Sequence, residues 1–202
     1  MIVSFGGADG TEIGVSCTSV SSLQAQYQAV INQYHLKSID LDIEGNTLDN
    51  TSANDRRNKA IKALEAANPG LRVSYTLPVD PSGLPSNAIS LLNNAKSNGT
   101  RVDVVNIMAM VYGACNIDMG TTADNATKAT HTQLVNMGLS AKVGITPMIG
   151  VNDVTCENFT TSNASTVTNF ANANTSYVSM IAYWELSADS SYSYLKIFHG
   201  FR

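Results

Sequence analysis

The stretch Ser38-Ile-Asp-Leu-Asp-Ile-Glu-Gly45 alternates carboxylates with branched apolar residues. A period of two sends successive side chains to opposite faces of a β-strand, so Asp40, Asp42 and Glu44 are expected to share one face. The apolar residues between them would cover the other face, against a helical layer. Three neighbouring acids repel one another and are costly to desolvate, so folding alone would not favour this arrangement. The stretch therefore predicts a carboxylate site, and the alternative is a solvated edge strand with its acids facing water.

Length and composition predict a single domain with a sizeable core, because the chain has 202 residues, of which 44% are hydrophobic. The net charge is −4, and the 12 Lys and Arg residues form no run or stripe. This distribution argues against nucleic acid or an anionic membrane as a partner and favours a neutral polymer. No apolar run approaches the ~18 to 20 residues that a membrane span needs, and the first residues do not resemble a signal peptide.

The cysteines are few and widely spaced, at Cys17, Cys115 and Cys156. This spacing provides no CxxC metal site or redox pair, and neither a metal nor another cofactor is expected. Cys115 and Cys156 could pair, but the sequence alone leaves their pairing open.

Hydrophobic periodicity predicts strands that alternate strictly with helices. The expected strands are 1–5, 38–44, 71–78, 102–112, 142–148 and 177–183, and the expected helices are about 20–35, 53–68, 86–98, 123–138, 164–173 and a short segment 192–198. Such alternation implies a parallel sheet with right-handed crossovers.

Two architectures fit this alternation, a doubly wound open sheet and a β/α barrel. Gly6-Gly7 is not part of a GxGxxG motif that opens a helix, so the phosphate-binding signal of many doubly wound folds is missing. Glu44, Tyr112, Asn152 and Trp184 lie at or just beyond the carboxyl ends of expected strands, where a barrel builds its active site. We therefore expect an α/β fold of the (β/α)8 TIM-barrel type, incomplete, with about six parallel strands.

With its acidic strand and these strand-end residues, the chain resembles the chitinases of glycoside hydrolase family 18, and most of all their bacterial branch. The family signature DxxDxDxE is matched in its last three acids by 40–44, although Lys37 stands in place of the first acid. Ser4-Phe5-Gly6-Gly7 is similar to the SxGG motif, Met110-Val111-Tyr112 to the MxY motif, and Trp184 to the tryptophan that closes the last strand. The four motifs occur in the family's order and span essentially the whole chain.

The resemblance also implies a gap, because the SxGG motif belongs to the third strand of the family's barrel. Residues 1–202 would then be one catalytic domain that holds strands three to eight, without the first two strand-helix units. A complete barrel usually needs ~250 residues. The two unpaired sheet edges would either mediate self-association or be curled and covered.

The family's chemistry implies a role for each matched residue. Glu44 would be the general acid, with its pKa raised by Asp42, and the 2-acetamido group of the sugar would act as the nucleophile. Asp42 would orient the acetamido N–H, and the Tyr112 hydroxyl would donate to the same group. Asp40 would share a proton with Asp42, and Ser4 would hydrogen-bond this pair.

Further residues are expected to bind the substrate, either chitin or a chitooligosaccharide. The resemblance implies that Trp184 forms an apolar floor under the reacting sugar. Met110 and Met148 could line the cleft, and Asn152 and Asp153, in the loop after the expected strand 142–148, could contact sugar. The alternative roles are structural: Trp184 as a core residue, Tyr112 as a packing residue with a satisfied hydroxyl, and the methionines as filling for the barrel interior.

One departure from the family bears on activity. The bacterial branch often has Met-Asp-Tyr-Gly where this chain has Met110-Val111-Tyr112-Gly113. A catalytically weak or silent chitin-binding relative is therefore one alternative to a chitinase. An endo-β-N-acetylglucosaminidase is another. Resemblance to the family also implies an extracellular protein.

Overall fold

The computed structural model describes residues 1–202, and the chain divides into two compact units. Unit 1 consists of residues 1–77 and 86–105, and unit 2 consists of residues 78–85 and 106–202. The main strands follow one another in the sheet order β1-β2-β3-β4-β5-β8, and strand order therefore follows chain order. The sheet does not close, because β1 and β8 each have a single neighbour in this order. The predicted α/β fold, with six parallel strands alternating with helices, is confirmed.

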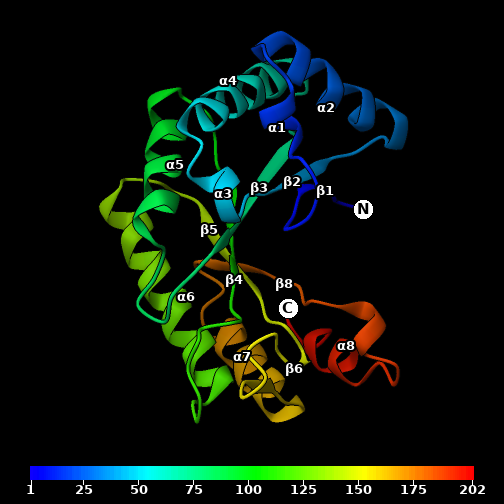
Figure 1. Cartoon of the computed structure of the whole chain (residues 1–202). Coiled ribbons are helices and arrows are strands. Elements are labelled where there is room, and N and C mark those ends of the chain that lie inside the picture. The colour runs from blue at the N-terminus through cyan, green and yellow to red at the C-terminus, as the bar shows by residue number, and fades with distance from the viewer. The chain divides into compact units, whose positions relative to one another are not determined.

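Unit 1 contains most of the first half of the chain (Figure 1). Its elements are β1 (Val3–Gly6), α1 (Ile13–Ser16), α2 (Val20–Tyr34), β2 (Ser38–Asp42), α3 (Gly45–Leu48), α4 (Thr51–Ala67), β3 (Arg72–Pro78, whose last residue belongs to unit 2), α5 (Ser86–Ser97) and the start of β4 (Val104–Met108).

Helix α2 shows how local sequence sets these boundaries. Ser19 and Ser22 form a capping box at its start, and His35 ends it in the left-handed conformation with a φ of 51°. Leu23, Tyr27 and Ile31 recur every four residues and are buried. This apolar stripe packs α2 within unit 1, where it lies alongside α4 (Figure 1).

Strand β2 lies between β1 and β3 and has the expected alternation. Ile39, Leu41 and Ile43 are completely buried. On the other face, Asp40 is in register with Ser4 of β1 and Ser74 of β3. Gly6 is required where β1 passes β2, because its φ is 116° and an added Cβ would lie 1.9 Å from the Asp42 carbonyl oxygen.

A buried ion pair fixes the loop that follows β1. The Arg57 guanidinium on α4 donates to Glu12 at 2.6 Å and to Asn54 at 2.6 Å. Both charged side chains are essentially inaccessible to water. Removing one partner of such a pair typically costs about 3–5 kcal/mol, because the other charge is left buried and unpaired. The pair therefore holds the loop that also carries Asp9, whose charge raises the pKa of Glu44.

Unit 2 contains the rest of the chain (Figure 1). Its elements are the end of β4, α6 (Met119–Asn136), β5 (Lys142–Thr146), the hairpin of β6 (Gly150–Val151) and β7 (Asn158–Phe159), α7 (Thr161–Ala173), β8 (Val178–Ile181), the 3-10 turn η1 (Leu186–Ala188) and α8 (Ser193–Phe198).

Element boundaries differ most from expectation around the end of β4. The strand ends at Met108 rather than at residue 112, and α6 begins at Met119 rather than at about residue 123. The earlier helix start has a clear cause, since the Asp118 carboxylate caps it by accepting the Thr121 N–H at 2.7 Å. Periodicity also gives no sign of α3 or of the β6–β7 hairpin, which are both very short.

Candidate active site

Asp40 is a buried carboxylate surrounded by hydroxyl donors. Ser4 donates to it at 2.6 Å, Ser74 at 2.5 Å, and Thr76 to both of its oxygens at 2.9 and 3.0 Å. Burial raises the pKa of Asp40 above its ordinary value, while these three side chains act in the opposite direction. The expected contact between Ser4 and the buried acids is therefore made with Asp40.

Asp42 follows on the same strand and has a different environment. Its Oδ1 atom is buried and has no hydrogen-bond partner. Burial, followed by the charges of Glu44 and Asp40, raises the pKa of Asp42 from 3.8 to about 7. A carboxyl group in this condition can hold or release a proton near neutral pH, which is characteristic of functional sites.

Glu44 lies just beyond β2, in extended backbone at the start of α3. Burial raises its pKa, and the nearby charge of Asp9 raises it further. The sequence predicts Asp42 as the charge that acts on Glu44. The two carboxyl groups do interact, because the charge of Glu44 raises the pKa of Asp42, and Asp9, from the loop after β1, also raises the pKa of Glu44.

The loop that follows β4 carries Tyr112 in unit 2. The Tyr112 hydroxyl is buried and has no hydrogen-bond partner. Burial raises the pKa of this phenol, as do the negative charges of Glu157 and Asp124. The Tyr112 hydroxyl is therefore a buried donor that no protein group accepts.

Trp184 follows β8 in unit 2 and is 56% exposed, which excludes the alternative of a core tryptophan. Its backbone is held by the segment after β5, because its N–H donates to the Pro147 carbonyl at 2.9 Å and its carbonyl accepts the Ile149 N–H at 2.8 Å. Met148 pairs with Trp184 in an isolated parallel bridge. Met148 and Met110 are both partly exposed.

Asn152 is 3% exposed, and its amide is used inside unit 2. Its Oδ1 accepts the Val111 N–H at 3.2 Å, and its Nδ2 donates to the carbonyls of Met148 and Gly150. These bonds tie the loop after β4 to the loop after β5.

A disulfide joins the same two loops. Cys115 and Cys156 are bonded, while Cys17 is free. The pairing that the sequence leaves open is therefore settled in the structure.

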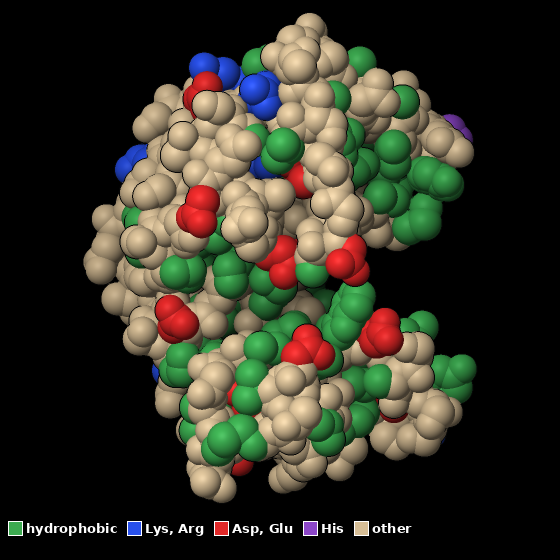
Figure 2. Space-filling model, viewed as in Figure 1, with side chains coloured by type: hydrophobic (Ala, Val, Ile, Leu, Met, Phe, Trp, Pro, Cys, Tyr) green, Lys and Arg blue, Asp and Glu red, His purple; other side chains and the backbone are tan.

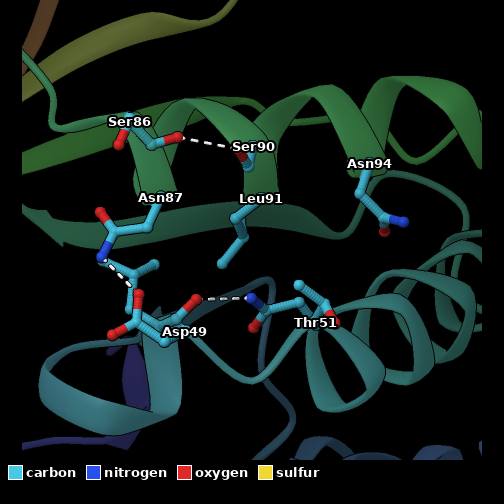
Figure 3. Close-up of a pocket in the computed structure, with 9 residues that line it drawn as sticks. Asp49, Thr51, Ser86, Asn87, Ser90, Leu91 and Asn94 are labelled. Carbon is cyan, nitrogen blue, oxygen red and sulfur yellow. Dashed lines mark hydrogen bonds between the residues drawn. The ribbon is translucent and has the colours of Figure 1, made fainter.

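A pocket of roughly 410 Å³ lies in unit 1, between the start of α4 and α5 (Figure 3). Asn87 on α5 donates to Asp49 at 2.8 Å, and Asn54 donates to the Leu48 carbonyl at 2.8 Å. Thr51, Ser86, Ser90, Leu91 and Asn94 complete the lining. Asp40, Asp42 and Glu44 are not among the lining residues, so this pocket is distinct from the carboxylate site.

Figure 2 shows few basic side chains on the face in view and no continuous basic patch. None of the helices combines the length and apolar character needed to cross a membrane. No three or more His, Cys, Asp or Glu side chains are grouped so that they could hold a metal ion.

Sequence reasoning missed several residues that support the site. Ser74 and Thr76 could have been found, because they alternate with apolar residues along β3, directly beside the acidic strand. Asp9 and Glu157 lie in loops and have no such periodic signal.

No family model matches the chain, but several known proteins are similar to it in sequence. The chain is 31% identical over 209 aligned residues to a probable bifunctional chitinase/lysozyme of Escherichia coli, covering 94% of this chain and 23% of that protein. It is also 31% identical over 209 residues to endochitinase 11 of Metarhizium anisopliae, covering 94% of this chain and 40% of that protein. The chain thus spans less than half the length of these relatives.

Two solved structures match the fold. The catalytic domain of a hyperthermophilic chitinase from Pyrococcus furiosus has a TM-score of 0.85 at 24% identity, over 99% of this chain and 73% of that one. A catalytic-site mutant of active domain 2 of a thermostable chitinase from the same organism, complexed with chito-oligosaccharides, has a TM-score of 0.86 at 25% identity, over 99% and 71%. The chain is therefore a homologue of the chitinases, and it has the fold of a chitinase catalytic domain.

Proposed function

We propose that this chain hydrolyses the β-1,4 bonds between N-acetylglucosamine units of chitin. The observation that carries the proposal is the pair Asp42 and Glu44, two partly buried carboxyl groups two residues apart in one chain segment, both with raised pKa values. A glycosidase needs a carboxylic acid that is still protonated near neutral pH, and burial together with like charges provides it.

Glu44 is the proposed general acid. It protonates the oxygen that leaves with the departing sugar while the carbonyl oxygen of the 2-acetamido group attacks the anomeric carbon. The C–O bond to the leaving sugar breaks as the bond to the acetamido oxygen forms. Water then opens this cyclic intermediate, and the Glu44 carboxylate takes up the proton that the water loses. The configuration at the anomeric carbon is retained.

Asp42 is the proposed stabiliser of the acetamido group. Its unpartnered Oδ1 can accept the acetamido N–H, which becomes more acidic as positive charge develops on the cyclic intermediate. Asp40 is the proposed buried partner of Asp42, and it accepts hydrogen bonds from the hydroxyls of Ser4, Ser74 and Thr76. The free hydroxyl of Tyr112 supports a role as donor to the acetamido oxygen.

Substrate binding is proposed for the remaining residues. The exposed indole of Trp184 suits stacking against a sugar face, and the partly exposed Met110 and Met148 suit apolar contact with substrate. The internal hydrogen bonds of Asn152 support a role in shaping the loop after β4.

The proposal is tested by incubating the chain with chitotetraose and, separately, with an N-linked glycopeptide, and separating the products by chromatography. We expect cleavage of chitotetraose to shorter oligomers and an intact glycopeptide. Cleavage of the glycopeptide alone would replace the proposal with an endo-β-N-acetylglucosaminidase. Binding of chitotetraose without cleavage would identify a silent relative.

Secretion is proposed from the disulfide between Cys115 and Cys156, because such bonds persist mainly in oxidising compartments. Mass spectrometry of the protein recovered from the culture medium and from cells of its source would test this. Recovery only inside cells, with reduced thiols, would contradict it.

Self-association of two copies through the open sheet edges is a further proposal. Each edge, at β1 and at β8, leaves one side of a strand without a partner, and Met1 and Ile2 beside β1 are exposed. Size-exclusion chromatography with light scattering should give a mass above that of one 21.5 kDa chain. A monodisperse monomer would contradict the proposal.

A further inference from the structure

The loop after β4 has an unusual backbone that requires external support. Val111, Gly113 and Asn116 all have left-handed conformations, with φ values of 53°, 73° and 61°. Left-handed backbone is disfavoured for a β-branched residue such as valine. Tyr112 lies between the first two of these residues, so the direction of its side chain depends on what holds the loop in this conformation.

Glu157 provides that support. Its side chain is buried, with the residue only 1% exposed. Its Oε2 atom accepts the N–H of Tyr112 at 3.1 Å, and its Oε1 atom accepts the N–H of Ala114 at 3.0 Å. Both carboxylate oxygens are therefore directed at the backbone of the loop that carries Tyr112.

The Glu157 backbone is itself well anchored. Its N–H donates to the Val154 carbonyl at 2.8 Å, and its carbonyl accepts the Asn152 N–H at 3.0 Å. Its neighbour Cys156 is bonded to Cys115, one residue beyond Ala114. Glu157 therefore links a fixed segment to the loop through two hydrogen bonds.

The chemistry of the side chain also favours a carboxylate at this position. A buried carboxylate is costly unless it is hydrogen-bonded, and backbone N–H groups satisfy it without an opposite charge. A glutamine can accept only one of the two N–H groups, because its NH₂ group would face the other donor. An aspartate is shorter by one methylene group and is not expected to reach both.

We infer that Glu157 is a positioning residue that fixes the loop backbone and thereby aims the Tyr112 hydroxyl for substrate. The inference rests on the proposed function for its catalytic consequence, while the hydrogen bonds themselves can be tested without any substrate. Glu157 acts through the loop backbone at Tyr112 and Ala114, because its own side chain is buried and both of its oxygens accept N–H groups of the loop.

The kinetic test is a double-mutant cycle with Glu157→Gln and Tyr112→Phe on chitotetraose. Losing one charge-assisted hydrogen bond is expected to lower kcat about 10- to 100-fold, with KM changed less than about threefold. In the Tyr112→Phe background, Glu157→Gln should lower kcat by less than about twofold, because the positioned hydroxyl is already gone. An equal loss in both backgrounds would overturn the inference.

Asp80→Asn is the matched control, because it removes one negative charge from an exposed position elsewhere in unit 2. Its kcat should stay within about twofold of the wild-type value. Should Glu157→Gln fail to fold, Glu157→Asp keeps the charge and is expected to show the same loss of kcat through its shorter reach. Full activity in the Glu157→Asp variant would count against the inference.

Amide hydrogen exchange separates this inference from the proposed function. Followed by NMR, the N–H groups of Tyr112 and Ala114 should exchange at least about tenfold faster in Glu157→Gln than in wild type or Asp80→Asn. A wild type that cleaves no substrate but shows this exchange pattern would sink the proposed function and leave the anchoring role intact. Unchanged exchange in Glu157→Gln would overturn the anchoring role itself.

Discussion

Strand β2 and the loop after β4 both carry side chains that we propose to take part in catalysis, but they hold them in different ways. The β2 segment carries its acids on regular extended backbone between two neighbouring strands, in register with Ser4 and Ser74. The loop carries Tyr112 between two residues with left-handed backbone, Val111 and Gly113, and is fixed by Glu157, Asn152 and a disulfide. A strand orders its side chains through a repeating geometry, whereas a loop needs supports that are distant in sequence.

The difference has a consequence for stability. On the strand, the cost arises from the chemistry, because carboxyl groups are desolvated and placed close together. In the loop, the cost arises from the backbone, because a valine adopts a positive φ. Substitutions can therefore relieve the two costs separately.

A large loss of activity is expected for Asp42→Asn on the strand side, second only to that expected for Glu44→Gln. Removing a group that stabilises developing charge should lower kcat on chitotetraose about 100- to 1000-fold. Steady-state kinetics with purified protein would check this. A kcat within about tenfold of wild type would mean that Asp42 does not stabilise the transition state.

The same variant should be more stable than wild type at high pH. The folded-state pKa of Asp42 is raised from 3.8 to about 7, so its protonated form contributes stability that is complete below about pH 4 and is lost as the pH rises to about 7. Asparagine cannot ionise and keeps this contribution. Discounted for partial solvent exposure, the gain at pH 8 is about 1–2 kcal/mol, measured by urea unfolding at pH 4 and pH 8. A gain that is the same at both pH values would contradict this assignment.

The loop side is tested next by replacing Cys115 and Cys156 together with serine. The bond closes a segment with a sequence separation of 41 residues, so its loss should reduce the free energy of unfolding by about 2–4 kcal/mol. Thermal unfolding of the double variant against wild type measures this loss, with Cys17→Ser as the control for a cysteine outside the bond. Equal melting temperatures for the double variant and wild type would mean that the disulfide does not support the loop.

The smallest effect is expected for Val111→Asn. Val111 is 41% exposed, so little packing is lost, and asparagine tolerates left-handed backbone better than valine does. The variant should be about 0.5–1 kcal/mol more stable than wild type, as measured by urea unfolding. A destabilised variant would show that the valine side chain makes contacts that outweigh its backbone strain.

The same contrast explains what the sequence can predict. The acidic strand is identifiable because a period-two pattern gives both its secondary structure and the face of each acid. The predicted end of β4 lies four residues too late, because Ala109 to Tyr112 continue an apolar pattern although the chain has already left the strand. Nothing in the local sequence of Glu157 indicates that it contacts Tyr112, since that contact spans 45 residues.

Replacing Glu44 with glutamine tests the central claim most directly. The substituted side chain keeps the size of glutamate but cannot donate an acidic proton, so hydrolysis of chitotetraose at pH 6 should fall about 100- to 10,000-fold with unchanged thermal unfolding. Glu185→Gln is the matched control, because it makes the same change at an exposed glutamate, which accepts a hydrogen bond from the Ser187 hydroxyl. This variant should retain near wild-type hydrolysis. Equal rates for wild type and Glu44→Gln would contradict the assignment of Glu44 as the general acid.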